Sequence, residues 1–134
     1  DFSSHPSSGN NQLVLTIQSD LPEISADPER LIQVITNLIS NADRHTQNGT
    51  ITISLTGEPG WQTICVSDTG TGMSEEMRKN ALKGYVSADK DYWRHGIGLY
   101  VCHQIITAHG GKIWLKSKEG EGTQVFFSLP EEVS

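Results

Sequence analysis

The sequence lacks the features that mark several special classes of protein. Its 134 residues include only two cysteines, Cys65 and Cys102, whose separation fits no metal-binding or redox motif. No apolar run approaches the ~20 residues that a membrane-spanning helix needs. There is also no signal peptide, internal repeat or low-complexity segment. We therefore expect a soluble, cytoplasmic chain with two buried thiols and no direct membrane contact.

Positive charge is also scarce. Ten basic residues against sixteen acidic ones give a formal net charge of -6, and such a surface repels a phosphate backbone. Nucleic acid is therefore not an expected partner, and a site for a phosphorylated ligand must gather positive charge locally. Apolar residues make up 35% of the chain and charged residues 19%, as in one globular domain. We expect residues 1–11 to form a flexible lead-in and residues 12–134 to form that domain.

Alternating apolar residues between turn signals predict five strands, over residues 13–17, 50–56, 61–67, 112–117 and 123–129. Asp27 and Pro28 predict a helix start, and this helix extends to about His45. Ser74 opens a second, short helix, and residues 97–109 have the apolar spacing of a third. Residues 83–95 have no clear period and predict a mobile loop. The expected fold class is α/β, a two-layer α/β sandwich with a mixed sheet of about five strands and helices on one face.

The first predicted helix has two stripes. Its core face has apolar residues at spacings of three and four, namely Leu31, Val34, Ile35, Leu38, Ile39 and Ala42. A polar stripe has the same spacing and consists of Gln33, Asn37, Asn41, Arg44 and His45. These polar residues are either solvated positions that happen to align, or a site where an amide oxygen holds magnesium and Arg44 contacts an anion. The stripe alone does not decide between the two.

Three loops contain closely spaced glycines. Residues 68–72 (Asp-Thr-Gly-Thr-Gly) directly follow a strand, where the aspartate can accept a hydrogen bond from an amine such as that of adenine. Residues 95–99 (His-Gly-Ile-Gly-Leu) open the third predicted helix, whose free N–H groups would suit phosphate. Residues 120–123 (Gly-Glu-Gly-Thr) form a tight turn before the last strand. Alone, each of the first two loops is a weak signal that also fits an ordinary turn, and residues 120–123 alone would predict a plain hairpin.

The order of these four segments is more specific than any one of them. It resembles the N box and the three glycine boxes of the GHKL ATPase superfamily. Residues 27–42 resemble the N-box helix of sensor histidine kinases, and residues 108–114 resemble the segment after their second glycine box. The likeness extends over residues 13–129. It implies a Bergerat ATP-binding fold and the catalytic domain of a two-component kinase, which passes the γ-phosphoryl group of ATP to a histidine on a separate dimerisation domain.

The resemblance also implies roles for individual residues. Asn41 would bind Mg²⁺, and Asn37 would occupy the place where hydrolytic relatives carry a water-activating glutamate, so these two are the expected catalytic residues. The expected cofactors are ATP and Mg²⁺. The expected ATP-binding residues are Asn41, Arg44, His45, Asp68, Gly70, Gly72, Met73, Gly96, Ile97, Gly98, Leu99 and Thr123.

None of the five histidines is part of the helical acceptor motif of such kinases, so we expect no autophosphorylation by this chain alone. The expected partners are the histidine-bearing dimerisation domain of the parent kinase and a downstream response regulator. The resemblance further implies a parent anchored at the cytoplasmic side of a membrane.

Two features depart from the family pattern. Residues 83–86 (Lys-Gly-Tyr-Val) occupy the place of the phenylalanine-bearing box, and Arg94 or His95 replaces the leading glycine of a short lid. A degenerate nucleotide-sensing module is therefore one alternative. A serine kinase or anti-sigma factor of the same superfamily is another. A water-hydrolysing ATPase is a third alternative, against which Asn37 argues.

Overall fold

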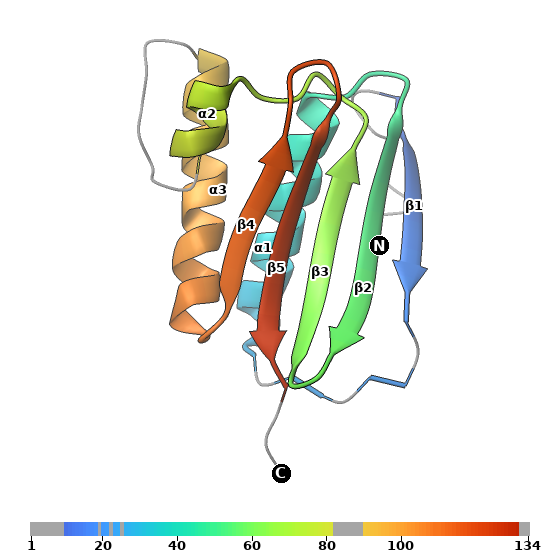
Figure 1. The fold of residues 1–134 in the computed structure, drawn as a ribbon, viewed down its shortest axis with the longest axis vertical. Helices are drawn as coiled ribbons and strands as arrows, with labels where there is room; N and C mark the ends of the chain where they lie inside the picture. The colour runs from blue at the N-terminus through green and yellow to red at the C-terminus, as the bar shows by residue number, and fades with distance from the viewer. Residues whose placement is uncertain (1–9, 19, 22, 25, 82–89, 132–134) are drawn as a thin grey trace.

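The computed structural model describes residues 10–18, 20–21, 23–24, 26–81 and 90–131, with the backbone alone for residues 80 and 90–98. The elements are β1 (Gln12–Ile17), α1 (Pro28–Arg44), β2 (Thr50–Glu58), β3 (Trp61–Asp68), α2 (Glu75–Asn80), α3 (Lys90–Ala108), β4 (Lys112–Ser117) and β5 (Thr123–Pro130). The sheet has five strands in the order β1-β2-β3-β5-β4. β1 is parallel to β2, and the remaining neighbours are antiparallel. The predicted mixed sheet with helices on one face is confirmed (Figure 1).

Helix α1 begins where the sequence predicts. The side chain of Asp27 accepts a hydrogen bond from the backbone N–H of Glu29 at 3.0 Å, and Pro28 occupies the first helical position. A helix leaves its first N–H groups without intrahelical partners, so an aspartate cap and a proline stabilise this end. The helix ends at Arg44, and His45 is its C-cap.

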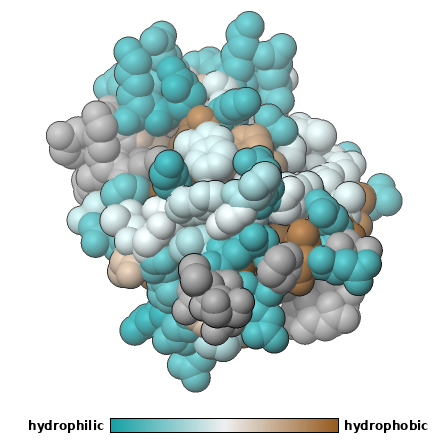
Figure 2. All heavy atoms as spheres, turned by 60° about the horizontal axis from the view of Figure 1, so that its bottom comes forward, coloured by the Kyte–Doolittle hydropathy of each residue, from teal (hydrophilic) through white to brown (hydrophobic). Residues whose placement is uncertain are grey.

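The hydrophobic core lies between the helices and one face of the sheet. Helices α1 and α3 and strand β5 contribute many of its deeply buried members, including Val34, Leu38, Leu99, Cys102, Ile106, Phe127 and Leu129. Figure 2 brings forward the end of the molecule at the bottom of Figure 1, where hydrophilic residues are mixed with residues of intermediate hydropathy and a few hydrophobic ones. Within the described part of the chain, no helix combines the length and the hydrophobicity needed to cross a membrane.

Helix α3 differs from the prediction. It begins at Lys90, so residues 90–95 belong to a regular helix and not to the predicted mobile loop. Gly96 and Gly98 consequently lie inside the helix and not at its start. Each glycine costs about 1 kcal/mol in a helix interior, a modest penalty that the surrounding turns can offset. Residues 83–89 of the predicted loop are outside the described residues.

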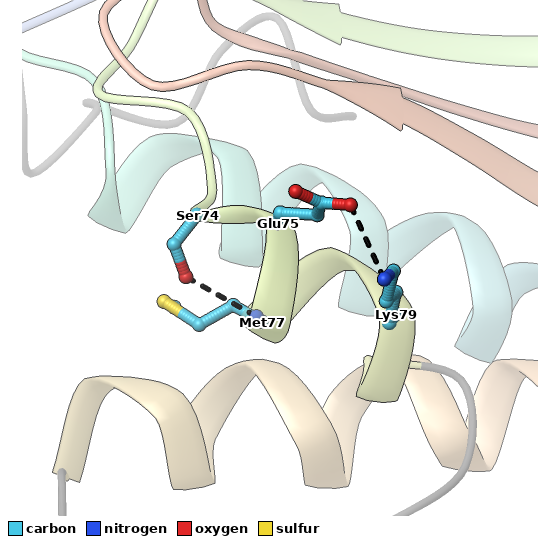
Figure 3. Close-up of polar contacts among 4 residues, drawn as sticks. All are labelled: Ser74, Glu75, Met77 and Lys79. Carbon is cyan, nitrogen blue, oxygen red and sulfur yellow. Dashed lines mark hydrogen bonds and ion pairs between the residues drawn. The ribbon is translucent and has the colours of Figure 1, made fainter.

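The short helix α2 agrees with the prediction. The Ser74 hydroxyl accepts a hydrogen bond from the backbone N–H of Met77 at 3.2 Å, and Glu75 pairs with Lys79 at 3.2 Å (Figure 3). The serine satisfies one unpaired N–H of the first turn. The Glu75–Lys79 pair is exposed, so it contributes little to stability.

The last residue of the expected lead-in is held against the end of α1. The Asn11 side chain donates hydrogen bonds to the Asp43 carboxylate at 3.0 Å and to the Thr46 carbonyl at 2.8 Å. Its amide oxygen also accepts a hydrogen bond from the backbone N–H of Gly49 at 2.9 Å. Asn11 therefore fixes the entry to β1. Residues 1–9 of the expected lead-in lie outside the described residues.

Candidate functional site

Three segments that are distant in the sequence meet at one end of the sheet. They are the C-terminal end of α1, the loop after β3 and the turn between β4 and β5, at the top of Figure 1. Asp68, the last residue of β3, is paired across the ladder with Thr123, the first residue of β5. The backbone N–H of Thr71 donates to the His45 carbonyl at 3.1 Å, which joins the loop to α1. The structure thus brings together predicted site residues from the N box and from the first and third glycine boxes.

Asp68 is buried at this junction, with 9% of its surface exposed. One of its carboxylate oxygens accepts a hydrogen bond from the backbone N–H of Gly70 at 2.9 Å. The bond fixes the carboxylate where the strand ends. A carboxylate held in this way is an acceptor for an exocyclic amine such as that of adenine.

The two glycines that follow Asp68 are required for different reasons. A Cβ at Gly70 would overlap the His45 carbonyl, so only a glycine permits the loop to pack against the end of α1. Gly72 has a φ of +71°, and a Cβ there would overlap the carbonyl of Lys118. An L-residue with a side chain is strained at such a φ even without an overlap.

Ser117 links the loop after β3 to the turn before β5. Its hydroxyl accepts a hydrogen bond from the backbone N–H of Met73 at 2.8 Å and donates to the Gly122 carbonyl at 3.0 Å. It also lies 2.8 Å from the Thr123 hydroxyl. Ser117 is not among the site residues predicted from the sequence. Only its place at the end of a strand, on the same face as Leu115, hints at such a role.

The polar stripe of α1 differs in burial from residue to residue. Asn41 is 6% exposed, and its amide oxygen lies 3.5 Å from a guanidinium nitrogen of the exposed Arg44. Asn37 is half-buried and faces α3, where it hydrogen-bonds with the Cys102 thiol. Burial raises the pKa of this thiol to about 11, although the bond with Asn37 partly opposes the increase. Asn41 and Arg44 therefore form the part of the stripe that lies at the loop end of α1.

Thr46 is a further residue that the sequence analysis did not identify. It is 1% exposed, directly after the half-buried His45, and its side chain packs between Gly49 and Gly70. Its side chain therefore forms part of the floor beneath the loop after β3. The preceding residues Arg44 and His45 predict ligand contacts, and no pattern in the sequence indicates that Thr46 packs against the loop.

The second glycine box, residues 95–99, lies in a different part of its helix than the sequence predicts. Because Gly96, Ile97 and Gly98 are inside α3, their N–H groups are not those of a helix start. Leu99 is 1% exposed and belongs to the core, as does Met73. The predicted helix start at residues 95–99 is therefore wrong, while contact of Gly96, Ile97 and Gly98 with phosphate stays a prediction.

The described side chains do not form a metal-binding site by themselves. Among the described residues, no group of three or more His, Cys, Asp or Glu side chains could hold a metal ion. A surface pocket of about 340 Å³ lies beside α2 and the β4–β5 turn, and it is lined by Met73, Glu75, Arg78, Ser117, Lys118 and Glu119. Because the described residues contain no such group of ligands, a cation at the Asn41 end would need ligand oxygens from a bound molecule as well as from the protein.

Comparison with known proteins agrees with this arrangement. The family described as "Histidine kinase-, DNA gyrase B-, and HSP90-like ATPase" matches residues 26–133. The adaptive-response sensory kinase SasA of Synechococcus elongatus is 39% identical over 127 residues, which cover 92% of this chain and 33% of that protein. SasA of Prochlorococcus marinus is 39% identical over 119 residues, covering 85% of this chain and 31% of that protein. The chain thus spans about a third of the length of these relatives.

Solved structures give the same result. The nucleotide-free catalytic domain of histidine kinase ThkA is 27% identical, with a TM-score of 0.76 over 91% of this chain and 79% of that one. Full-length ShkA in complex with AMPPNP is 25% identical, with a TM-score of 0.81 over 96% of this chain and 27% of that one. The fold, the sequence relatives and the order of motifs agree, and the chain belongs to the histidine kinase-, DNA gyrase B- and HSP90-like ATPase family, within which it is the ATP-binding catalytic domain of a histidine kinase.

Proposed function

We propose that this domain binds ATP with Mg²⁺ at the loop end of the sheet and transfers the γ-phosphoryl group to a histidine of a separate dimerisation domain. One observation carries the proposal. The buried carboxylate of Asp68 and the Asn41–Arg44 end of α1 are joined by the hydrogen bond from Thr71 to His45. An acceptor for a base and donors for phosphates are thereby held at a fixed separation.

The base would lie against the loop after β3. Asp68 accepts a hydrogen bond from the adenine amine, while Gly70 and Gly72 allow the ring to approach the backbone closely. Thr123, opposite Asp68 in the ladder, borders the same site, and the His45 ring packs beside the base. Met73 and Leu99 are buried core residues, and in this proposal they border the base where the site meets the core.

The phosphates would lie toward the end of α1. The Asn41 amide oxygen is a suitable ligand for Mg²⁺, which needs few protein ligands when phosphate oxygens complete its shell. When bound, Mg²⁺ neutralises charge on the phosphates. The exposed Arg44 guanidinium is close enough to Asn41 to contact the same phosphates. Gly96, Ile97 and Gly98 would reach the phosphates after the first turns of α3 unwind, which frees their N–H groups.

The transfer itself needs positioning more than acid–base chemistry. The lone pair of a neutral imidazole nitrogen forms the new P–N bond while the bond from the γ-phosphorus to the β–γ bridging oxygen breaks. ADP leaves with that oxygen, and the phosphorylated imidazole loses a proton to solvent. An amide at Asn37 cannot act as a general base toward water at neutral pH, so this position favours transfer over hydrolysis.

The remaining partners are part of the proposal. The acceptor histidine belongs to a dimerisation domain of the parent protein, and the phosphoryl group then passes to a response regulator. The ThkA kinase, which has a similar fold, has been solved in complex with the response regulator TrrA, and this supports the assignment. We also propose that the parent is anchored at the cytoplasmic side of a membrane.

Calorimetric titration of ATP, with and without Mg²⁺, tests the two halves of the site separately. We expect Asp68→Asn to weaken ATP binding at least about tenfold in either condition, because the carboxylate oxygens that orient the amine are altered. We expect Asn41→Ala to remove most of the Mg²⁺ enhancement and to leave binding without Mg²⁺ nearly unchanged. Gln33→Ala is a matched control on the exposed part of the same stripe, and its binding should equal that of the wild type.

The absence of any binding by the folded wild-type domain would contradict nucleotide recognition and, with it, the proposed phosphoryl transfer. Incubation of the chain with γ-labelled ATP provides a second test. We expect no label on the protein, and stable phosphohistidine on the isolated chain would contradict the need for a separate acceptor domain.

A further inference from the structure

Strand β1 begins at the end of the sheet where β3 ends (Figure 1). Its first residue, Gln12, is aligned with Thr50 of β2, and the next residue of β2, Ile51, is aligned with Asp68 of β3. Asn11, the residue just before β1, therefore lies at the same end of the sheet as the candidate nucleotide site, with β2 between it and the strand that ends in Asp68.

The half-buried Asn11 side chain is bonded to the segment that connects α1 to β2. Its amide nitrogen donates to the Asp43 carboxylate at 3.0 Å and to the Thr46 carbonyl at 2.8 Å. Its amide oxygen accepts a hydrogen bond from the Gly49 N–H at 2.9 Å. Both N–H bonds and the carbonyl oxygen of the amide are thus in use, and an aspartate of the same size would lack both donors. Asn11 therefore holds residues 43–49 in one conformation.

The segment that Asn11 holds is in close contact with the loop after β3. A Cβ at Gly49 would overlap the Thr69 hydroxyl, and one at Gly70 would overlap the His45 carbonyl. The buried Thr46 side chain lies between the two glycines and contacts both. A shift of residues 45–49 would therefore move Thr69 and Gly70 or open a gap beneath them.

The last step leads to the carboxylate that would bind the base. The Gly70 N–H donates to the Asp68 carboxylate at 2.9 Å, so the position of Gly70 fixes the orientation of that carboxylate. The Thr69 N–H donates to the Thr50 carbonyl at 3.2 Å, which keeps the loop at the start of β2. Hydrogen bonds and direct packing contacts thus connect Asn11 to Asp68 without a break.

We propose that Asn11 is a positioning residue of the nucleotide site, an assignment that rests on the function proposed for Asp68. Asn11 holds the segment between α1 and β2, and that segment holds the loop in which Gly70 orients the Asp68 carboxylate. A binding group that is held loosely loses affinity, because its ordering must then occur when the ligand binds. The contacts lead to the base side of the site, so the loss of Asn11 should affect every adenine nucleotide alike.

The other end of β1 provides a matched control. The Gln18 side-chain oxygen accepts a hydrogen bond from the Gly57 N–H at 3.0 Å, and the Gln18 N–H donates to the Leu55 carbonyl at 2.9 Å. Asn11 and Gln18 therefore both use an amide oxygen to bind a glycine N–H beside β1. Gln18, however, lies at the end of the sheet remote from Asp68.

Calorimetric titration with ADP and with ATP, each with and without Mg²⁺, tests the proposal. We expect Asn11→Ala to weaken binding about three- to tenfold, by the same factor for both nucleotides and in both conditions. Gln18→Ala should bind both nucleotides as the wild type does. Urea denaturation shows that each titrated variant is folded and how much stability it has lost. Asn11→Ser, whose hydroxyl can still bond to one of the three groups, should show a smaller loss of affinity and replaces Asn11→Ala if that variant does not fold.

Unchanged affinity in Asn11→Ala, when the wild type binds ATP, overturns the positioning role alone. An equal loss in Gln18→Ala also overturns it, because the effect would then follow from the stability of β1 in general. A loss confined to titrations with Mg²⁺ overturns it too, since Asn11 would then act on the phosphate side. No ATP binding by the folded wild type would contradict the proposed function and the role of Asn11 together.

Discussion

The loop after β3 and the first half of α3 would both contact the nucleotide, but the chain holds them in different ways. The loop is tied to α1 through His45, to β4 through Ser117, and to the β4–β5 turn through the bond from Gly120 to the Thr71 carbonyl at 2.8 Å. The first half of α3 is a helix interrupted by Gly96 and Gly98. The base side of the site is thus held by tertiary hydrogen bonds before a ligand binds, whereas on the phosphate side we propose that helical bonds are exchanged for ligand contacts. Glycine substitutions in the two regions should therefore have opposite effects on stability.

The largest effect is expected at Gly72. Gly72→Ala adds a Cβ that overlaps the Lys118 carbonyl at a φ of +71°, so we expect the free energy of unfolding to fall by at least about 2 kcal/mol. Urea denaturation measures the loss. Gly60→Ala is the control, since Gly60 has a φ of +82° but no atom within 4 Å of the added Cβ. Equal losses in the two variants would show that the loop is not closely packed against Lys118.

The pH dependence of stability reports whether the Cys102 thiol is buried between the second half of α3 and α1. Its thiol donates to the Val34 carbonyl at 3.7 Å, and burial raises its pKa from 9.0 to about 11. Above pH 9 the unfolded thiol loses its proton while the folded thiol keeps it, so stability falls as the pH rises. We expect the wild type to lose on the order of 2 kcal/mol between pH 9 and pH 11 through this group.

Urea denaturation at several pH values measures this loss. The comparison is with Cys102→Ala, whose stability at neutral pH is lower because of the cavity but whose decline above pH 9 should be shallower. Other titrating groups contribute equally to both proteins. Parallel declines in the two proteins would mean that the thiol is not buried between α3 and α1.

The smallest effect on stability is expected in the first half of α3. Gly96→Ala replaces a glycine in a helix interior and should raise the free energy of unfolding by about 0.5–1 kcal/mol. The same change should weaken ATP binding several-fold, because a more stable helix releases its N–H groups less readily. Urea denaturation and calorimetry on one preparation measure both quantities. A loss of stability would show that residue 96 is not helical in solution.

Much of the fold could be predicted because its signals are local. The cap at Asp27, the turn at Pro59 and Gly60, and the alternation in the five strands each lie within a few residues. The start of α3 was missed because residues 90–95 have no apolar period, and two nearby glycines indicated a helix start. Helix propensity and tertiary contacts can extend a helix through such a segment.

The sequence predicted which residues the candidate site contains, but not the contacts that hold those residues in place. The position of Asp68 at the end of a strand could be read from the order of residues. The pairing of Asp68 with Thr123, the contact of Gly70 with the His45 carbonyl, and the role of Ser117 depend on strand order. Strand order joins segments that are far apart in the chain, and no local pattern encodes it.

We expect the nucleotide to bind where β3 ends and not elsewhere on the domain. Two-dimensional amide NMR of the chain during titration with ATP and Mg²⁺ tests this most directly. We expect shifts for the amides of residues 68–73, Arg44, His45 and Thr123, with none at Gly60 on the opposite end of the sheet. Shifts confined to the Gly60 end, or no shifts at saturating ATP, would contradict it.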